Sequence, residues 1–324
     1  MPFVIAFALA AGAMPLVILA GRTTGLVDRP SSDGLKIHGR PVPLTGGIAV
    51  TAAALVAAWV FDVRSGWMLG AVALALLVGL ADDARSLPAW SRAAGQAMSG
   101  ALLVAAGFRL EPLGPFAAVG VVVTVMACAN AVNLVDGQDG LAGGLAAIST
   151  AGLLFLMPVG DEAGRALAAA LIGSLAAFLL WNRPPARVFL GNGGAYAVGT
   201  VLAVLVSHAG AQGWPELLAA GICLGVFAYE LISTVVRRAF QRRSLVAGDR
   251  GHAYDVAARV LGSRGRSTAL FLGVGAVSLA AAMLVGSSST SVAVWVTAAY
   301  VAVLVAGGVL LQRPRVRTMK EGSG

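Results

Sequence analysis

The strongest constraint on this chain is a succession of long apolar stretches, because a helix needs about 20 apolar residues to cross the hydrocarbon core of a membrane. Of its 324 residues, 58% are hydrophobic and only 12% are charged. A water-soluble globule cannot bury so much apolar side chain, and a disordered chain has the opposite composition. We therefore expect an all-α, polytopic integral membrane protein that forms a single domain over residues 1–324. Its eleven expected transmembrane helices cover approximately residues 2–20, 44–61, 67–81, 90–107, 115–132, 141–159, 163–181, 194–209, 214–236, 267–286 and 291–311.

The Lys and Arg residues predict the orientation of these helices. With eleven spans, the loops on one side and the C-terminal tail hold 20 of the 23 Lys and Arg residues, while the opposite loops hold Arg64, Arg109 and Arg165. Since basic loops stay in the cytoplasm, the N-terminus is expected outside and the C-terminus inside. No basic residue precedes the first stretch, which favours a retained helix over a cleaved signal peptide. The net charge of +8 then faces anionic lipids and requires no nucleic acid.

The basic side also carries nearly all of the reactive side chains. Lys36, His38 and Arg40 could hold an anionic head group, or they could belong to an ordinary basic inner loop. Asp82 and Asp83 end an apolar helix, where the helix dipole disfavours negative charge. Mg²⁺ or a cationic partner would offset that cost, unless the pair is simply solvated. The inner loops expected to form the site cover about 21–43, 82–92, 130–144, 182–195 and 237–266.

The densest polar run is Asn130, Asn133, Asp136 and Asp139, with an amide or carboxylate group at every third residue. On an unbroken helix these groups would fan across about half of the circumference. A glycine follows each Asp and can break the helix, which would fold the carboxylates back towards the two Asn side chains. An oxygen-rich pocket of this kind suits a hard cation or nucleotide hydroxyls, whereas helix capping would explain only one such group.

Two further loops suit phosphate. A Gly-rich turn over residues 191–195 leads into a helix, so its backbone N–H groups could cradle phosphate, unless it is only a tight interhelical turn. Eight Arg residues lie between positions 237 and 266, and Arg forks match phosphate oxygens. A basic inner loop would explain these Arg residues, but it would not explain the run Asp249-Arg250-Gly251-His252.

Together these loops resemble the polyprenyl-phosphate N-acetylhexosamine-1-phosphate transferases from about residue 21 to residue 255. The run from Asn130 to Leu141 matches the family pattern N-x-x-N-x-x-D-G-x-D-G-L at every fixed position. The first inner loop and the Asp pair support the resemblance. Glu230 supports it too, because the family usually shows an acidic residue there.

The chain departs from the family pattern in two motifs. The turn that usually reads F-x-G-D-x-G-S reads F-L-G-N-G-G-A here, so Asn192 stands where the family has a metal-binding Asp. The loop that usually reads D-R-x-H-x-H-H reads D-R-G-H-A-Y-D, and His252 is the one His that remains in it.

The resemblance implies transfer of a sugar 1-phosphate from a UDP-sugar to undecaprenyl phosphate, with release of UMP, on the cytoplasmic face of a bacterial plasma membrane. It implies Mg²⁺, or Mn²⁺, held by Asn133, Asn192 and Asp82. The expected partners are the lipid bilayer, the polyprenyl phosphate and the UDP-sugar, and a homodimer is left open. The implied catalytic residues are Asp82, Asp83, Asp136 and Asp139, and the implied substrate-binding residues are Lys36, His38, Asn130, Asn133, Arg250 and His252.

Two other functions compete with this one. A transporter would place charged residues near the bilayer midplane, whereas here the acids cluster at one level. A family member that only binds lipid or nucleotide is supported by Asn192. For an enzyme, direct attack by the lipid phosphate is favoured, because its second pKa near 6 leaves it mostly dianionic at pH 7. Base or nucleophilic catalysis by Asp82 or Asp83 stays an alternative.

Overall fold

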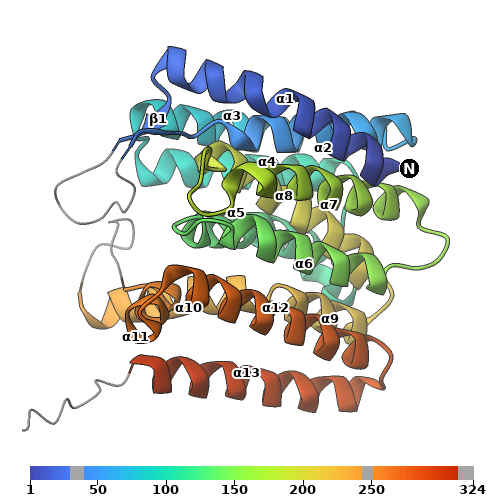
Figure 1. Cartoon of the computed structure of the whole chain (residues 1–324). Helices are drawn as coiled ribbons and strands as arrows, with labels where there is room; N and C mark the ends of the chain where they lie inside the picture. The colour runs from blue at the N-terminus through green and yellow to red at the C-terminus, as the bar shows by residue number, and fades with distance from the viewer. Residues whose placement is uncertain (30–39, 243–250, 313–324) are drawn as a thin grey trace, which may run out of the picture.

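A computed structural model describes residues 1–29, 40–242 and 251–312. Over these ranges the chain forms helices, one short 3₁₀ segment and two very short strands (Figure 1). The elements are α1 (Pro2–Thr24), β1 (Val27–Asp28), β2 (Val42–Pro43), α2 (Gly46–Val60), α3 (Gly66–Arg85), α4 (Ala89–Ala105), η1 (Glu111–Phe116), α5 (Ala117–Val135), α6 (Leu141–Leu156), α7 (Glu162–Asn182), α8 (Gly191–Gly210), α9 (Trp214–Cys223), α10 (Gly225–Phe240), α11 (Ala253–Leu261), α12 (Arg264–Gly286) and α13 (Thr290–Gln312).

The helical, multi-pass membrane architecture expected from the apolar stretches is confirmed. Among the described residues, seven helices are long and apolar enough to cross a membrane, or eight if the bent pair α9 and α10 forms one span. The apolar helices α2 and α6 are shorter. Each of the eleven apolar stretches coincides with a helix or with the bent pair, but the number of spans and their orientation stay predictions.

The stretch 214–236, expected as one helix, is two helices that meet at 72°. The break leaves carbonyl groups of α9 without helical hydrogen-bond partners. The buried hydroxyl of Ser149 donates to one of them, the backbone oxygen of Cys223, at 2.6 Å. A glycine on either side, Gly221 and Gly225, weakens the helix at this point. The bend thus coincides with two glycines and a hydrogen bond from another helix, in a segment whose apolar pattern is continuous.

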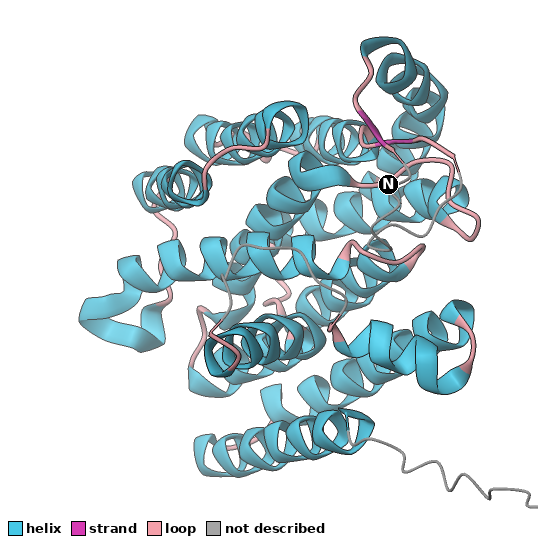
Figure 2. Ribbon diagram, turned by 90° about the vertical axis from the view of Figure 1, so that its left-hand side faces the viewer, coloured by secondary structure: helices cyan, strands magenta, loops and turns pink. Residues whose placement is uncertain are grey.

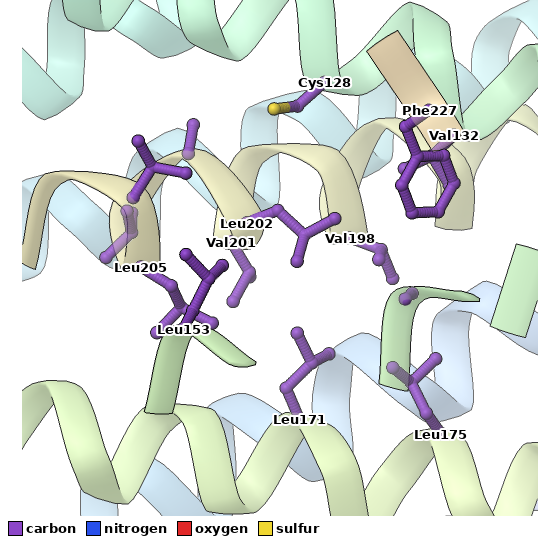
Figure 3. Packing of buried hydrophobic residues seen from close by; sticks show 14 of the residues in the cluster. Cys128, Val132, Leu153, Leu171, Leu175, Val198, Val201, Leu202, Leu205 and Phe227 are labelled. Carbon is purple, nitrogen blue, oxygen red and sulfur yellow. The ribbon is translucent and has the colours of Figure 1, made fainter. Parts of the chain in front are cut away.

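Helix α8 forms the centre of the bundle. Every one of its residues is buried except Asn192 and His208, one near each end. In Figure 3, Val198 and Leu202 of α8 lie between Leu171 of α7 and Cys128 of α5. Since lipid tails are as apolar as these side chains, close van der Waals packing against the neighbouring helices, rather than exclusion from water, holds α8 in position. Its first turn therefore has a well-defined place at one end of the bundle.

A close approach of backbones places α3 against the first turn of α8. A Cβ atom at Gly79 would collide with the backbone of Asn192 and Gly193. The sequence predicted a span over about 67–81 that ends in Asp82 and Asp83, and α3 does carry the pair at its C-terminal end, continuing to Arg85. The carboxylate pair thus lies within the last turn of α3, about one helical turn past the point of closest approach.

The two strands are the one departure from an all-α structure in the described residues. They form an antiparallel pair in which Val27 faces Pro43 (Figure 2). Phe189 donates its N–H to the backbone oxygen of Pro43 at 2.8 Å, so the pair is fastened to the loop before α8. The strands and α11 lie at one end of the bundle, opposite the start of α1 (Figure 1). That end also holds the first turn of α8.

Candidate active site

The first turn of α8 is surrounded by carboxylates. Asp136 accepts a hydrogen bond from the N–H of Gly191 at 3.2 Å. Asp83 accepts from the N–H of Asn192 at 3.0 Å and from that of Gly193 at 3.1 Å. The sequence had suggested these N–H groups as a phosphate cradle, and the structure corrects this interpretation. The N–H groups at the positive end of the helix dipole already donate hydrogen bonds to two acidic side chains.

Asp82 accepts more hydrogen bonds than Asp83. Its side chain is only 5% exposed. Oδ1 accepts the N–H of Leu87 at 2.7 Å, and Oδ2 accepts Arg92 at 3.3 Å, the amide of Asn192 at 2.9 Å and the hydroxyl of Tyr196 at 3.3 Å. These four donors offset the cost of burying a charge. They also occupy most of the lone pairs that could meet a metal or a proton.

Asn192 connects Asp82 to the end of α5. Its amide nitrogen donates to Asp82, and its amide oxygen accepts a short hydrogen bond from the side chain of Asn133. An ionised carboxylate can only accept, so this orientation of the amide follows from chemistry. The expected convergence of Asp82, Asn133 and Asn192 is therefore confirmed as a contact, while their metal-binding role stays a prediction.

The run from Asn130 to Asp139 does not form one pocket as expected. The predicted break is confirmed, since α5 ends at Val135 and α6 begins after Gly140, which has a φ of 75°. Beyond the break the side chains separate. Asn130 donates to Gln96 of α4 at 2.7 Å, and Asp139 accepts from the N–H of Ala186 at 3.0 Å. The helical period turns Asn130 and Asn133 towards different neighbours, and the break separates Asp136 from Asp139, so Asn133 and Asp136 are the two that reach α8.

Asp136 has a carboxyl group that resists ionisation. Burial raises its pKa well above the ordinary range, and the charges of Asp83 and Asp139 raise it further. The hydrogen bond from Gly191 opposes this shift without cancelling it. Since perturbed carboxyl groups cluster at functional sites, Asp136 is a strong candidate for a functional role.

A second group of polar residues joins α10 to α11. Glu230 is fully buried, and its carboxylate lies 3.4 Å from Nδ1 of His252 and accepts the N–H of Ala253 at 3.4 Å. The ring of His252 stacks on Tyr254, with ring centres 5.2 Å apart. Tyr254 in turn donates to the backbone oxygen of Leu134, between Asn133 and Asp136 in the chain. The group around His252 is thus tied to the end of α5.

Three residues that support the site were not predicted. Arg92 and Tyr196 both contact Asp82. Asn182, 2% exposed, accepts the N–H of Gly140 at 2.8 Å and donates to the oxygen of Val188 at 2.9 Å. Polar residues inside otherwise apolar segments could have signalled Tyr196 and Asn182, because buried polar groups need partners.

Three of the predicted substrate-binding residues, Lys36, His38 and Arg250, lie outside the described residues. His252 is described and buried, and Tyr254 links it to α5.

The oxygen atoms around α8 fit a Mg²⁺ site that is shared with substrate and water, and not a metal site made of protein side chains alone. In the ranges that the structure describes, no three His, Cys, Asp or Glu side chains are grouped closely enough to hold a metal. Mg²⁺ is commonly bound by one or two carboxylates together with substrate phosphates and water. Such a set is provided by Asp83, Asp136 and the amide oxygen of Asn133. One oxygen of Asp136 is available for a ligand, since it has no hydrogen bond to the described part of the chain.

Comparison with known proteins identifies related enzymes. Residues 66–209 match the family model described as glycosyl transferase family 4. An undecaprenyl-phosphate alpha-N-acetylglucosaminyl 1-phosphate transferase of Thermotoga maritima is 32% identical over 251 residues, 74% of this chain and 76% of that protein. A phospho-N-acetylmuramoyl-pentapeptide-transferase of Limosilactobacillus fermentum is 34% identical over 229 residues, 62% and 69% of the two chains.

A transferase of Yersinia pestis, with the same name as the Thermotoga protein, is 28% identical over 294 residues, 84% of this chain and 80% of that protein. The matched segments include α3, α5 and α8, the helices around the acidic cluster, which consists of Asp82, Asp83 and Asp136. This chain therefore belongs to glycosyl transferase family 4, and it is a phosphoglycosyltransferase of the polyprenyl-phosphate hexosamine-1-phosphate transferase superfamily.

Proposed function

We propose that this enzyme transfers an N-acetylhexosamine 1-phosphate from a UDP-sugar to undecaprenyl phosphate and releases UMP. Two of the three relatives above carry both undecaprenyl phosphate and N-acetylglucosamine in their names, which supports this acceptor and this class of sugar. We further propose that it acts in a bacterial plasma membrane, in the synthesis of cell wall, lipopolysaccharide or another surface polysaccharide.

One observation carries the proposal: Asp83, Asn133 and Asp136, which come from two helices, meet at the first turn of α8. Phosphoryl transfer needs positioning and charge neutralisation more than covalent chemistry from the protein. Rigid carboxylates and an amide at the end of a helix bundle provide such positioning. The positive-inside count supports placing this end on the cytoplasmic face, where nucleotide sugars would be available.

In the proposed reaction an oxygen of the lipid phosphate attacks the β-phosphorus of the UDP-sugar. The bond from that phosphorus to the bridging oxygen breaks, and UMP leaves with the bridging oxygen. The acceptor phosphate is mostly dianionic at pH 7, so it needs no general base from the protein. Lys36 and His38 would meet the lipid phosphate, and Arg250 and His252 would hold the sugar nucleotide. If an acidic side chain acts as base or nucleophile, Asp83 is better placed than Asp82, because the oxygens of Asp83 accept two hydrogen bonds while those of Asp82 accept four.

A bound Mg²⁺ would supply neutralisation of the diphosphate charge. We propose that Asn133, Asp83 and Asp136 would hold it, with Asn192 and Asp82 beside them. Asp139 supports the loop before α8 through Ala186, and Asn130 supports α4 through Gln96.

An exchange assay tests the proposal. Purified protein, undecaprenyl phosphate, UDP-N-acetylglucosamine and Mg²⁺ are mixed with labelled UMP, and label is expected to appear in the UDP-sugar. Omission of the lipid phosphate should abolish the exchange. A chain that binds UDP-sugar or lipid phosphate but shows no exchange at any Mg²⁺ or Mn²⁺ concentration, and with other UDP-hexosamines, would instead be a binding protein, the alternative that Asn192 favours.

A further inference from the structure

The amide of Asn192 occupies a position that only a hydrogen-bond donor can fill. Its nitrogen lies 2.9 Å from Oδ2 of Asp82, an oxygen that also accepts from Arg92 and Tyr196. Its oxygen accepts from the amide of Asn133. Its backbone N–H donates to Asp83. One residue therefore joins α3, α5 and the first turn of α8.

An Asp at position 192, which is what the family pattern carries, would change this contact in one respect. A carboxylate oxygen would replace the amide nitrogen and would stand against Oδ2 of Asp82. Two carboxylates at hydrogen-bond distance cannot both be ionised without a proton or a cation between them. Arg92 cannot remove this conflict alone, because it is 3.3 Å from the same oxygen and already neutralises Asp82.

We propose that Asn192 is a positioning residue that closes the contact between Asp82 and Asn133 without a divalent cation. In this chain the acidic cluster therefore folds without a bound metal. Mg²⁺ is required only for catalysis, where Asp83 and Asp136 would hold it. The inference rests on the proposed function for the identity of the metal, whereas the hydrogen bonds on which it stands are independent of it.

Thermal unfolding of the purified protein in detergent at pH 8, without substrates, tests this inference. The variant Asn192→Asp is compared with wild type in EDTA and in millimolar Mg²⁺. In EDTA, Asn192→Asp is expected to melt about 4 °C or more below wild type, because it places two carboxylates in contact. Mg²⁺ is expected to restore most of this loss and to shift wild type much less.

Two control variants separate the added charge from other effects. Asn192→Ala removes the donor without adding a carboxylate, so its loss should be similar in EDTA and in Mg²⁺. Asn182→Asp puts a carboxylate in another buried Asn site, where the amide donates to Val188, and its loss should likewise be insensitive to Mg²⁺. Rescue by the cation should thus be specific to a carboxylate at position 192.

Two results would overturn the inference: equal melting temperatures of wild type and Asn192→Asp in EDTA, or equal Mg²⁺-dependent shifts in both. The measurement uses no substrate, so it is separate from the exchange assay. If exchange fails but the Mg²⁺-dependent stability of Asn192→Asp appears, the proposed function fails and the role of Asn192 stands. If exchange succeeds but the stability of Asn192→Asp does not depend on Mg²⁺, the proposed function stands and the role of Asn192 fails.

Discussion

The hydroxyl of Tyr254 donates a 3.0 Å hydrogen bond to the backbone oxygen of Leu134, and so joins α11 to the last turn of α5. A side chain at position 137 would strike this hydroxyl, so Gly137 leaves room for it. Tyr254 stands where the family pattern has a His, and its ring covers His252. The departure from the pattern thus places a phenol hydroxyl, which bonds α5, where the family has an imidazole.

Tyr254→Phe should therefore slow UMP exchange about tenfold, as the loss of one hydrogen bond of about 1.4 kcal/mol at the site would. Tyr300→Phe is the matched control, because it removes a 2.6 Å contact with Ser278 on α12, an element outside the acidic cluster. It should cost similar thermal stability and leave the exchange rate unchanged. An undiminished exchange rate in Tyr254→Phe would show that the bond has no functional role.

The single variants Asp83→Ala and Asp136→Ala are expected to reduce exchange by at least about 100-fold, the scale of losing one charge contact in a transition state. Exchange rates of the purified variants, normalised to folded protein, provide the measurement. Full activity in either variant would remove that residue from the proposed site.

Asp82→Ala should also lose at least about 100-fold in exchange, but for an additional reason. The sequence places Asp82 in a polar loop, where its loss would hardly affect folding. The structure corrects this: it is 5% exposed and receives four hydrogen bonds, so the variant leaves several buried donors without a partner. A drop in melting temperature larger than that of Asp83→Ala is expected. Unchanged stability would mean that Asp82 is not the structural centre of the cluster.

Asp136→Asn should separate stability from activity. Burial raises the pKa of Asp136, so between the unfolded value of about 4 and the raised folded value the native state binds more protons than the unfolded state. This group therefore stabilises the fold at low pH, and its contribution is lost as the pH rises through that window. Asp136→Asn keeps an acceptor for Gly191 and has no charge to bury.

Relative to wild type, the melting temperature of Asp136→Asn should consequently increase as the pH rises from about 4 to 8, while exchange is lost. The wild-type exchange rate should fall on acidification at a higher pH than an ordinary Asp would give. A stability difference that does not vary with pH would contradict the buried, pKa-raised state of this carboxyl group.

Metal dependence provides a further test of Asn192. Asp would add a full negative charge beside the proposed Mg²⁺ ligands Asp83 and Asn133, so Asn192→Asp should lower the Mg²⁺ or Mn²⁺ concentration needed for half-maximal exchange. Wild type should be active but require more metal. Activity in Asn192→Asp together with none in wild type at any metal concentration would identify wild type as a binding protein. An unchanged metal requirement would place residue 192 away from the metal.

The predicted orientation can be checked with thiol labelling in intact cells. Cys128 and Cys223 are buried, so single Cys variants have little background. Arg64→Cys should react with a membrane-impermeant reagent, whereas Arg183→Cys should react only after the membrane is opened. A reporter fused at Gly324 should read cytoplasmic. The reverse pattern would mean that the number of spans is wrong.

Much of the architecture could be predicted from the sequence because its signals are local. Apolar stretches of helical length indicate helices wherever they occur, and the glycines at positions 137 and 140 mark the break between α5 and α6. The family pattern over Asn130–Leu141 depends equally on neighbours in the chain. None of these inferences required knowledge of which helix lies beside which.

The partners of the polar groups were decided by tertiary structure. Asp83 bonds Asn192 across 109 residues of sequence, a contact that depends on α3 approaching α8 at Gly79. The same packing fills the expected phosphate cradle with carboxylates and turns Asn130 towards α4. The sequence alone determined which residues are candidates for the chemistry, because residue type and local spacing suffice for that. Which of them meet was determined only when the helices packed, since a hydrogen bond needs its two atoms within about 3 Å and local spacing cannot specify a distance between helices far apart in the chain.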